Sequence, residues 1–148
     1  MLNGSFNDLC NANVLLTKNI LEYLTLGNPD VHFIYFSTMS LLQKNILPDD
    51  YLNFRDMTDY ALSKYVLEIL CSRYRIPITL VRFSALFYKN PARDELSKLV
   101  YNAVKNNKIT IYNNGVAKRD FIPLDIATQY VVKLIGKKNF FGKTLNIV

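Results

Sequence analysis

Tyr60 and Lys64, in the stretch YALSKYVLE, lie four positions apart in a segment predicted to be helical. Residues four apart share one face of a helix, so the phenol and the ammonium are expected to be neighbours. A positive charge beside a phenol favours the phenolate and lowers its pKa, which suits proton transfer. Tyr101 and Lys105 have the same spacing, so the spacing alone does not identify a site.

The segment that precedes the first pair distinguishes it from the second. Residues 31–37, VHFIYFS, form a nearly continuous apolar run, which is typical of a strand buried in a parallel sheet. Ser37 and Thr38 come at its end, and ligands bind at that edge of open α/β sheets. Thr38 could there donate a hydrogen bond to a substrate oxygen. No such strand precedes Tyr101.

The elements that would position these groups alternate between helix and strand. Apolar residues, Leu15 and Leu21 among them, recur at spacings of three and four before Gly27, and Asp56 or Thr58 can cap a second helix. Parallel strands need such a crossover helix. The sequence therefore predicts an α/β sheet, with helices at 9–26 and 56–74 and strands at 31–37 and 77–83.

The later part of the chain predicts further elements of the same kinds. Asp125 is expected to stabilise the start of the last helix, with Pro123 near its first position. The expected elements are a helix at 93–106, a strand at 109–112, a turn at 113–115, a helix to about 135, and a closing strand in KTLNIV.

The composition argues against several classes of function. The formal net charge is +6, but the 18 lysines and arginines are scattered except in GKKNFFGK, so no nucleic-acid partner is expected. The single His32 and the distant Cys10 and Cys71 predict no metal site, a structural histidine and reduced thiols. No apolar run reaches the roughly 18 to 20 residues of a membrane span, and no signal peptide is evident, so a cytoplasmic location without membrane contact is expected.

Several motifs together resemble one family. FIYFST, YALSKYVLE, ITLVRFSALF and ITIYNNGVAKRDFIPLDIA follow one another as in extended short-chain dehydrogenases, the NAD-dependent epimerase/dehydratase family acting on nucleotide sugars. The resemblance covers essentially the whole chain. It implies a single partial domain, residues 1–148. Residues 1–88 would form the later half of a Rossmann-type parallel sheet, and residues 89–148 the start of a small substrate-binding region.

The resemblance also implies roles for individual residues. Tyr60 would exchange a proton with a sugar hydroxyl, and Lys64 would bind the nicotinamide ribose and tune that tyrosine, with Ser37 also on the cofactor side. Thr38 would orient the substrate. Arg119, in KRDFI, would contact the phosphates of the nucleotide sugar. The alternative for this arginine is a surface ion pair with Asp120 or Asp125.

The chain departs from the family at the cofactor phosphates. The family's first βαβ unit has a glycine-rich turn, G-x-x-G-x-x-G, whereas the five glycines here stand at 4, 27, 115, 136 and 142. We therefore expect an internal or C-terminal fragment that is inactive as an isolated chain, whether the whole enzyme is an epimerase, a dehydratase or a reductase.

An alternative function is a non-catalytic interaction module or one half of a split enzyme. The strand at 31–37 would then lie at an open sheet edge that an N-terminal partner chain could pair with. The family's use of the helices around 9–26 and 56–74 in dimers also makes a homodimer an expectation.

Overall fold

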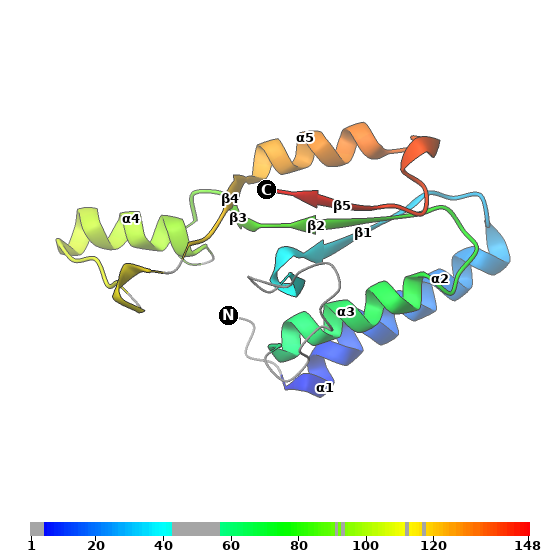
Figure 1. The fold of residues 1–148 in the computed structure, drawn as a ribbon, viewed down its shortest axis with the longest axis horizontal. Coiled ribbons are helices and arrows are strands. Elements are labelled where there is room, and N and C mark those ends of the chain that lie inside the picture. The colour runs from blue at the N-terminus through cyan, green and yellow to red at the C-terminus, as the bar shows by residue number, and fades with distance from the viewer. Residues whose placement is uncertain (1–4, 43–56, 91, 93, 112, 117) are drawn as a thin grey trace. The chain divides into compact units, whose positions relative to one another are not determined.

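The computed structural model describes residues 5–42, 57–90, 92, 94–111, 113–116 and 118–148 (Figure 1). The chain forms two compact units. The first contains Met1–Arg82 and Ile135–Asn146, and the second contains Phe83–Leu134 and Ile147–Val148. The division thus falls between residues 82 and 83, and residues 135–146 belong with the N-terminal part. The functional boundary expected at residue 88 stays a prediction.

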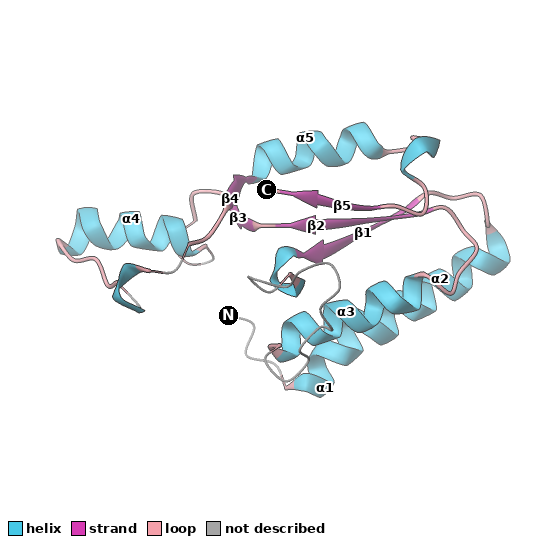
Figure 2. Ribbon diagram, viewed as in Figure 1, coloured by secondary structure: helices cyan, strands magenta, loops and turns pink. Residues whose placement is uncertain are grey.

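The first unit is built on a three-stranded sheet. The strands point the same way in Figure 2, and their order is β1-β2-β5. Leu80 N donates to Lys143 O and Ser84 N donates to Ile147 O, so β2 and β5 advance together as parallel strands do. The predicted partial Rossmann-like α/β fold is confirmed. The strands are β1 (Phe33–Thr38), β2 (Ile78–Phe83) and β5 (Thr144–Ile147).

Two helical segments of the first unit match the predicted helices. Ser5 caps the first, where its hydroxyl accepts from Asp8 N and the Asp8 carboxylate accepts from Ser5 N. Thr58 caps the second by accepting from Ala61 N at 3.2 Å, which is one of the two predicted caps. The first segment comprises α1 (Phe6–Leu9), a π-helical stretch (Cys10–Leu15) and α2 (Leu16–Gly27), and the second is α3 (Asp59–Cys71).

One apolar cluster joins these helices to the sheet. Leu21 of α2 and Leu67 of α3 are completely buried against Tyr35 of β1 and Ile78 of β2. Each such leucine contributes roughly 1.5–3 kcal/mol through burial. Leu15, predicted on the apolar face, is instead 51% exposed. It ends the π-helical stretch, whose wider turns shift the face that later residues present.

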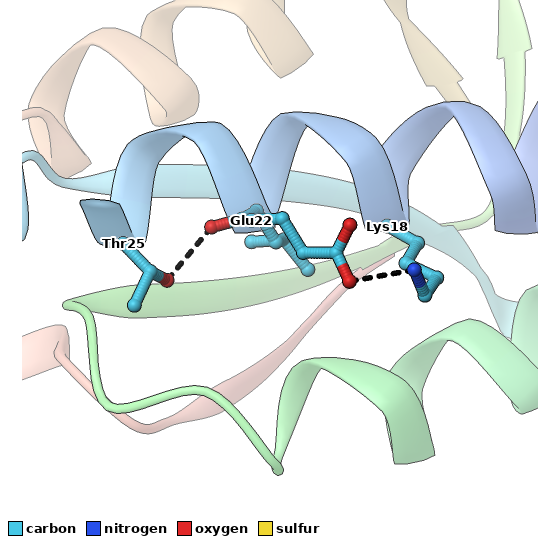
Figure 3. Close-up of polar contacts among 4 residues, drawn as sticks. Lys18, Glu22 and Thr25 are labelled. Atoms are coloured by element: carbon cyan, nitrogen blue, oxygen red, sulfur yellow. Dashed lines mark hydrogen bonds and ion pairs between the residues drawn. The ribbon is translucent and has the colours of Figure 1, made fainter. Parts of the chain in front are cut away.

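The outer side of α2 has both polar and apolar residues. In Figure 3, Lys18 Nζ pairs with Glu22 Oε1 at 2.6 Å, and Thr25 Oγ1 donates to the Leu21 carbonyl at 2.7 Å. The exposed apolar residues Leu16, Ile20 and Tyr23 follow at spacings of four and three, which places them on one stripe of the helix.

His32 ties the segment after residue 135 to the sheet. Thr79 Oγ1 donates to Phe140 O at 2.8 Å, so it accepts from His32 Nε2, also at 2.8 Å. His32 Nδ1 accepts from Gly136 N at 3.1 Å. These bonds assign the neutral Nε2–H tautomer, and burial lowers the pKa of His32. The histidine therefore has the structural role that the sequence predicted.

The second unit contains a small parallel sheet that the sequence did not predict. Strand β3 (Ala85–Phe87) pairs with β4 (Phe121–Pro123), with Ala85 opposite Phe121. Two helices accompany it, α4 (Glu95–Asn106) and α5 (Leu124–Leu134). Asp125 lies in the first turn of α5, and Pro123 directly precedes the first residue of that helix, as predicted.

One element predicted for the second unit is not formed. Residues 109–111 of the expected strand have no strand structure, and residue 112 lies outside the described residues. Ile109 and Ile111 are 57% and 70% exposed, so this β-branched run has no sheet face to cover. The turn predicted next to it is present, with positive φ angles at Asn114 and Gly115.

Candidate active site

The carboxyl end of β1 presents two buried hydroxyl side chains. Ser37 and Thr38 are 6% and 8% exposed. Thr38 Oγ1 accepts from Ser40 N and donates to Ser40 Oγ, both at 3.1 Å, and so caps the short 3-10 helix Met39–Leu41. Ser37 Oγ, in contrast, has no hydrogen-bond partner among the described residues. Of the two hydroxyls, that of Ser37 is therefore buried and unpaired within the described part of the chain, while that of Thr38 is bonded to Ser40.

The tyrosine and lysine pair lies in the first turns of α3 and reaches β1. Lys64 Nζ donates to the Phe36 carbonyl at 3.0 Å, directly before Ser37 in the chain. The ammonium also lies 4.7 Å from the centroid of the Tyr35 ring and 5.9 Å from that of Tyr60. The structure thus brings Lys64, Tyr60 and the end of β1 together, as the sequence predicted.

The electrostatic effect of this pair differs from the prediction. Burial raises the pKa of the Tyr60 phenol and lowers the pKa of the Lys64 ammonium, because each charged form loses hydration. The expected lowering of the Tyr60 pKa by Lys64 was wrong for this structure. The ammonium lies over the ring face, bonded to the Phe36 carbonyl, so desolvation dominates at the phenol.

Two polar residues near this site were missed by the sequence analysis. Ser63 is fully buried on α3, and its hydroxyl donates to the Tyr60 carbonyl at 2.9 Å. Asn13, from the π-helical stretch, donates to Ser63 Oγ at 3.0 Å. This chain of bonds fixes the first turn of α3 against the preceding helical segment. Asn13 stands between the apolar residues Ala12 and Val14, and a polar side chain in that position is the signal that could have found it.

Arg119 belongs to the second unit. Its guanidinium pairs with the carboxylate of Glu95 in the first turn of α4, and both side chains are more than half exposed. The alternative of a surface ion pair was therefore correct in kind, although the partner is neither Asp120 nor Asp125. An exposed pair of this sort is weak, so the guanidinium can exchange Glu95 for another anion at little cost.

The second tyrosine and lysine pair lacks comparable surroundings. Tyr101 is 47% exposed on α4. Lys105 lies in the last turn of the same helix, where its charge favours the helix end.

The described residues include no group of three or more side chains that could hold a metal ion. Cys10 and Cys71 are free, and burial, with a smaller effect of Glu68, raises the pKa of Cys71 to about 11, so its thiol stays protonated. Among the described residues, none of the helices is both long and apolar enough to cross a membrane.

The parallel α/β sheet, the hydroxyls at the carboxyl end of β1 and the Tyr–Lys pair on α3 agree with the motifs that the sequence showed. The model of the NAD dependent epimerase/dehydratase family matches residues 3–147. The chain belongs to this family.

Individual relatives agree with the family assignment. An uncharacterised UDP-glucose epimerase of Bacillus subtilis is 25% identical over 121 residues, which are 78% of this chain and 38% of that protein. UDP-glucuronic acid 4-epimerase of Bacillus cereus, solved with UDP-glucuronic acid and NAD, is 25% identical, with a TM-score of 0.70 over 91% of this chain and 45% of that one.

A third relative supports the fold alone. The dTDP-glucose 4,6-dehydratase of Bacillus anthracis, solved with NAD, has a TM-score of 0.79 over 99% of this chain and 49% of that one, at 19% identity. The chain thus spans half or less of the length of these three relatives.

Proposed function

We propose that the protein takes part in NAD-dependent epimerisation, dehydration or reduction of a nucleotide-activated sugar, and that these 148 residues are inactive on their own. The observation that supports this most is the anchoring of Lys64 to the Phe36 carbonyl at the end of β1, with Tyr60 one helical turn away. That edge of a parallel sheet is where ligands of α/β proteins bind.

In this proposal Tyr60 moves the proton. The phenol is protonated at neutral pH and can donate to a sugar oxygen, although burial raises its pKa and so makes it a weaker acid than a free tyrosine. Thr38, after releasing Ser40, orients the sugar through its hydroxyl. The first turn of α3 is held by Asn13 and Ser63, which limits the movement of the phenol during proton transfer.

The residues at the end of β1 fit the nicotinamide ribose of NAD. The Ser37 hydroxyl is buried without a partner, and Lys64 offers an ammonium whose charge no carboxylate among the described residues neutralises. NAD, when bound, supplies the hydride acceptor or donor. The pyrophosphate needs a glycine-rich turn that the five glycines of this sequence do not form, and this is why we propose that the isolated chain is inactive.

Arg119 is proposed to bind the diphosphate of the nucleotide sugar. Guanidinium groups bind phosphate through two parallel hydrogen bonds, and the exposed pair with Glu95 can be exchanged for them. The relatives solved with UDP-glucuronic acid, or named for UDP-glucose, support a nucleotide sugar as the ligand class. A cytoplasmic location is part of the same proposal.

A second candidate is a non-catalytic interaction module or one half of a split enzyme. Strand β1 lies at one end of the described sheet order β1-β2-β5, and an edge strand can pair with another chain. Self-association through the helices is also proposed, and the exposed stripe Leu16, Ile20 and Tyr23 of α2 supports it.

The test uses the full chain fused at residue 1 to the glycine-rich βαβ unit expected of the family, taken from the Bacillus cereus epimerase. We expect the fusion, but not the isolated chain, to convert UDP- or dTDP-linked sugars with NAD. Tyr60→Phe should abolish that turnover. Tyr101→Phe, in the second pair of the same spacing, should leave it unchanged. Turnover that survives Tyr60→Phe would refute the proton-transfer role, and a folded fusion without turnover would favour the interaction module.

A further inference from the structure

The ammonium of Lys64 is held by groups that carry no formal charge. Its hydrogen bond goes to the Phe36 carbonyl at 3.0 Å, and the Tyr35 ring centroid lies 4.7 Å from Nζ. Among the described residues no carboxylate forms an ion pair with it. Burial lowers the pKa of Lys64, so the charged form has lost part of its hydration. The groups that offset part of that loss are therefore uncharged ones.

The Tyr35 ring is suited to that task. A cation within about 6 Å of an aromatic centroid is attracted by the negative face of the ring, and the attraction strengthens as water is removed. Tyr35 is only 8% exposed and packs in the core with Leu67 and Cys71, so its ring cannot turn away. Burial, with Cys71, Tyr60 and Glu68, raises the pKa of Tyr35, so it stays a neutral phenol.

The hydroxyl of Tyr35 does not explain why a tyrosine stands there. It is buried and has no hydrogen-bond partner among the described residues. A buried hydroxyl without a partner costs stability, so it is the ring rather than the hydroxyl that the site uses. Phenylalanine at this position would keep the ring face and remove the unpaired oxygen.

We propose that Tyr35 is a positioning residue for Lys64: its ring face and the Phe36 carbonyl hold the ammonium at the end of β1 before any ligand binds. The inference rests on the proposed function, in which Lys64 binds the nicotinamide ribose. A fixed ammonium loses less side-chain entropy on binding than a free one, so the site is partly organised in advance.

The experiment measures the pKa of Lys64 in the full chain, without NAD or sugar. Lysines are reductively methylated with carbon-13, which keeps their charge, and titrated by NMR, with Lys64 assigned through Lys64→Arg. Two variants are compared, Tyr35→Phe and Tyr35→pentafluorophenylalanine. They have nearly the same shape, but fluorination removes the negative ring face.

We expect Tyr35→Phe to match the wild type and the fluorinated variant to have a Lys64 pKa lower by about 0.4 to 1.5. A 4-fluorophenylalanine variant, closer in shape to phenylalanine, should fall between them and serves if the pentafluoro variant does not fold. An unchanged pKa would overturn the proposal. A raised pKa would overturn it too, because it would mean only that water had entered.

The same exchange at Tyr60, whose ring is 5.9 Å from the ammonium, gives the spatial control. The exchange at Tyr60 should change the Lys64 pKa less than the exchange at Tyr35 does. A larger change would mean that the Tyr60 ring, and not the Tyr35 ring, positions the ammonium. No step of this experiment needs turnover or cofactor. If the proposed function is wrong, the effect of Tyr35 on the Lys64 pKa can still be measured. If Tyr35 has no such effect, the proposed function is not thereby refuted.

Discussion

Replacing Arg82 by methionine should strongly destabilise the first unit. Arg82 of β2 binds Glu68 of α3 through two hydrogen bonds, Nε to Oε1 at 2.9 Å and a terminal nitrogen to Oε2 at 2.5 Å. The two side chains are only 18% and 7% exposed. Arg82→Met leaves the Glu68 carboxylate buried without its partner, and breaking a buried pair in this way costs about 3–5 kcal/mol.

The size of the effect can be checked by thermal and urea unfolding. For a chain of this length a loss of 1 kcal/mol lowers the midpoint by about 2–4 °C, so Arg82→Met should lower it by about 6–20 °C. Replacing both residues by apolar ones of similar volume should recover most of that loss, because neither charge is then stranded. Lys18→Met, which breaks the exposed pair with Glu22, is the matched control and should leave the midpoint nearly unchanged.

Two results would contradict this reasoning. An Arg82→Met midpoint within the error of the wild type would mean that the carboxylate is solvated despite its 7% exposure. A double variant as unstable as the single one would mean that packing, rather than the stranded charge, sets the cost.

Two further predictions concern association and pH. Tyr23→Lys together with Ile20→Lys on the exposed stripe of α2 should convert a self-associated form to monomer in sedimentation experiments, and association that persists unchanged would exclude this face. The free energy of unfolding should fall as the pH drops below about 6.5, because the folded state keeps His32 neutral with a lowered pKa while the unfolded state takes up the proton first. His32→Gln should flatten that part of the pH profile, since it is the only histidine, and an unchanged slope would contradict the role of the Gly136 bond.

Much of the fold could be predicted because its signals are local. A continuous apolar run predicted β1, and the cap at Thr58 with the following apolar periodicity predicted α3. The pairing of β3 with β4 was not predictable, since strands of three residues have no measurable periodicity. The segment at 109–111 was predicted to be a strand because its β propensity is high, but it forms none, and no strand of the described residues pairs with it.

The sequence predicted that Lys64 and Tyr60 lie near the end of β1, but it did not predict the electrostatics there, and the roles of these residues stay a prediction. Sequence spacing placed Tyr60 and Lys64 on one helix face and Ser37 at a strand end. It could not show that the ammonium would contact the Phe36 carbonyl and the Tyr35 ring, because those groups belong to β1, almost thirty residues before Lys64 in the chain. The sign of the Tyr60 pKa change depends on that choice and on burial.

The most direct measurement is the thermal midpoint with saturating NAD for the isolated chain, the fusion, and the fusion with Lys64→Met. At a hundredfold excess over Kd, a ligand of the folded state adds about 2.7 kcal/mol, which is a rise of about 5–11 °C. We expect that rise in the fusion, a clearly smaller one with Lys64→Met, and none in the isolated chain. A rise in the isolated chain would contradict the proposal that NAD binding needs the glycine-rich turn. An equal rise with Lys64→Met would contradict the proposal that the end of β1 is the nicotinamide end of an NAD site.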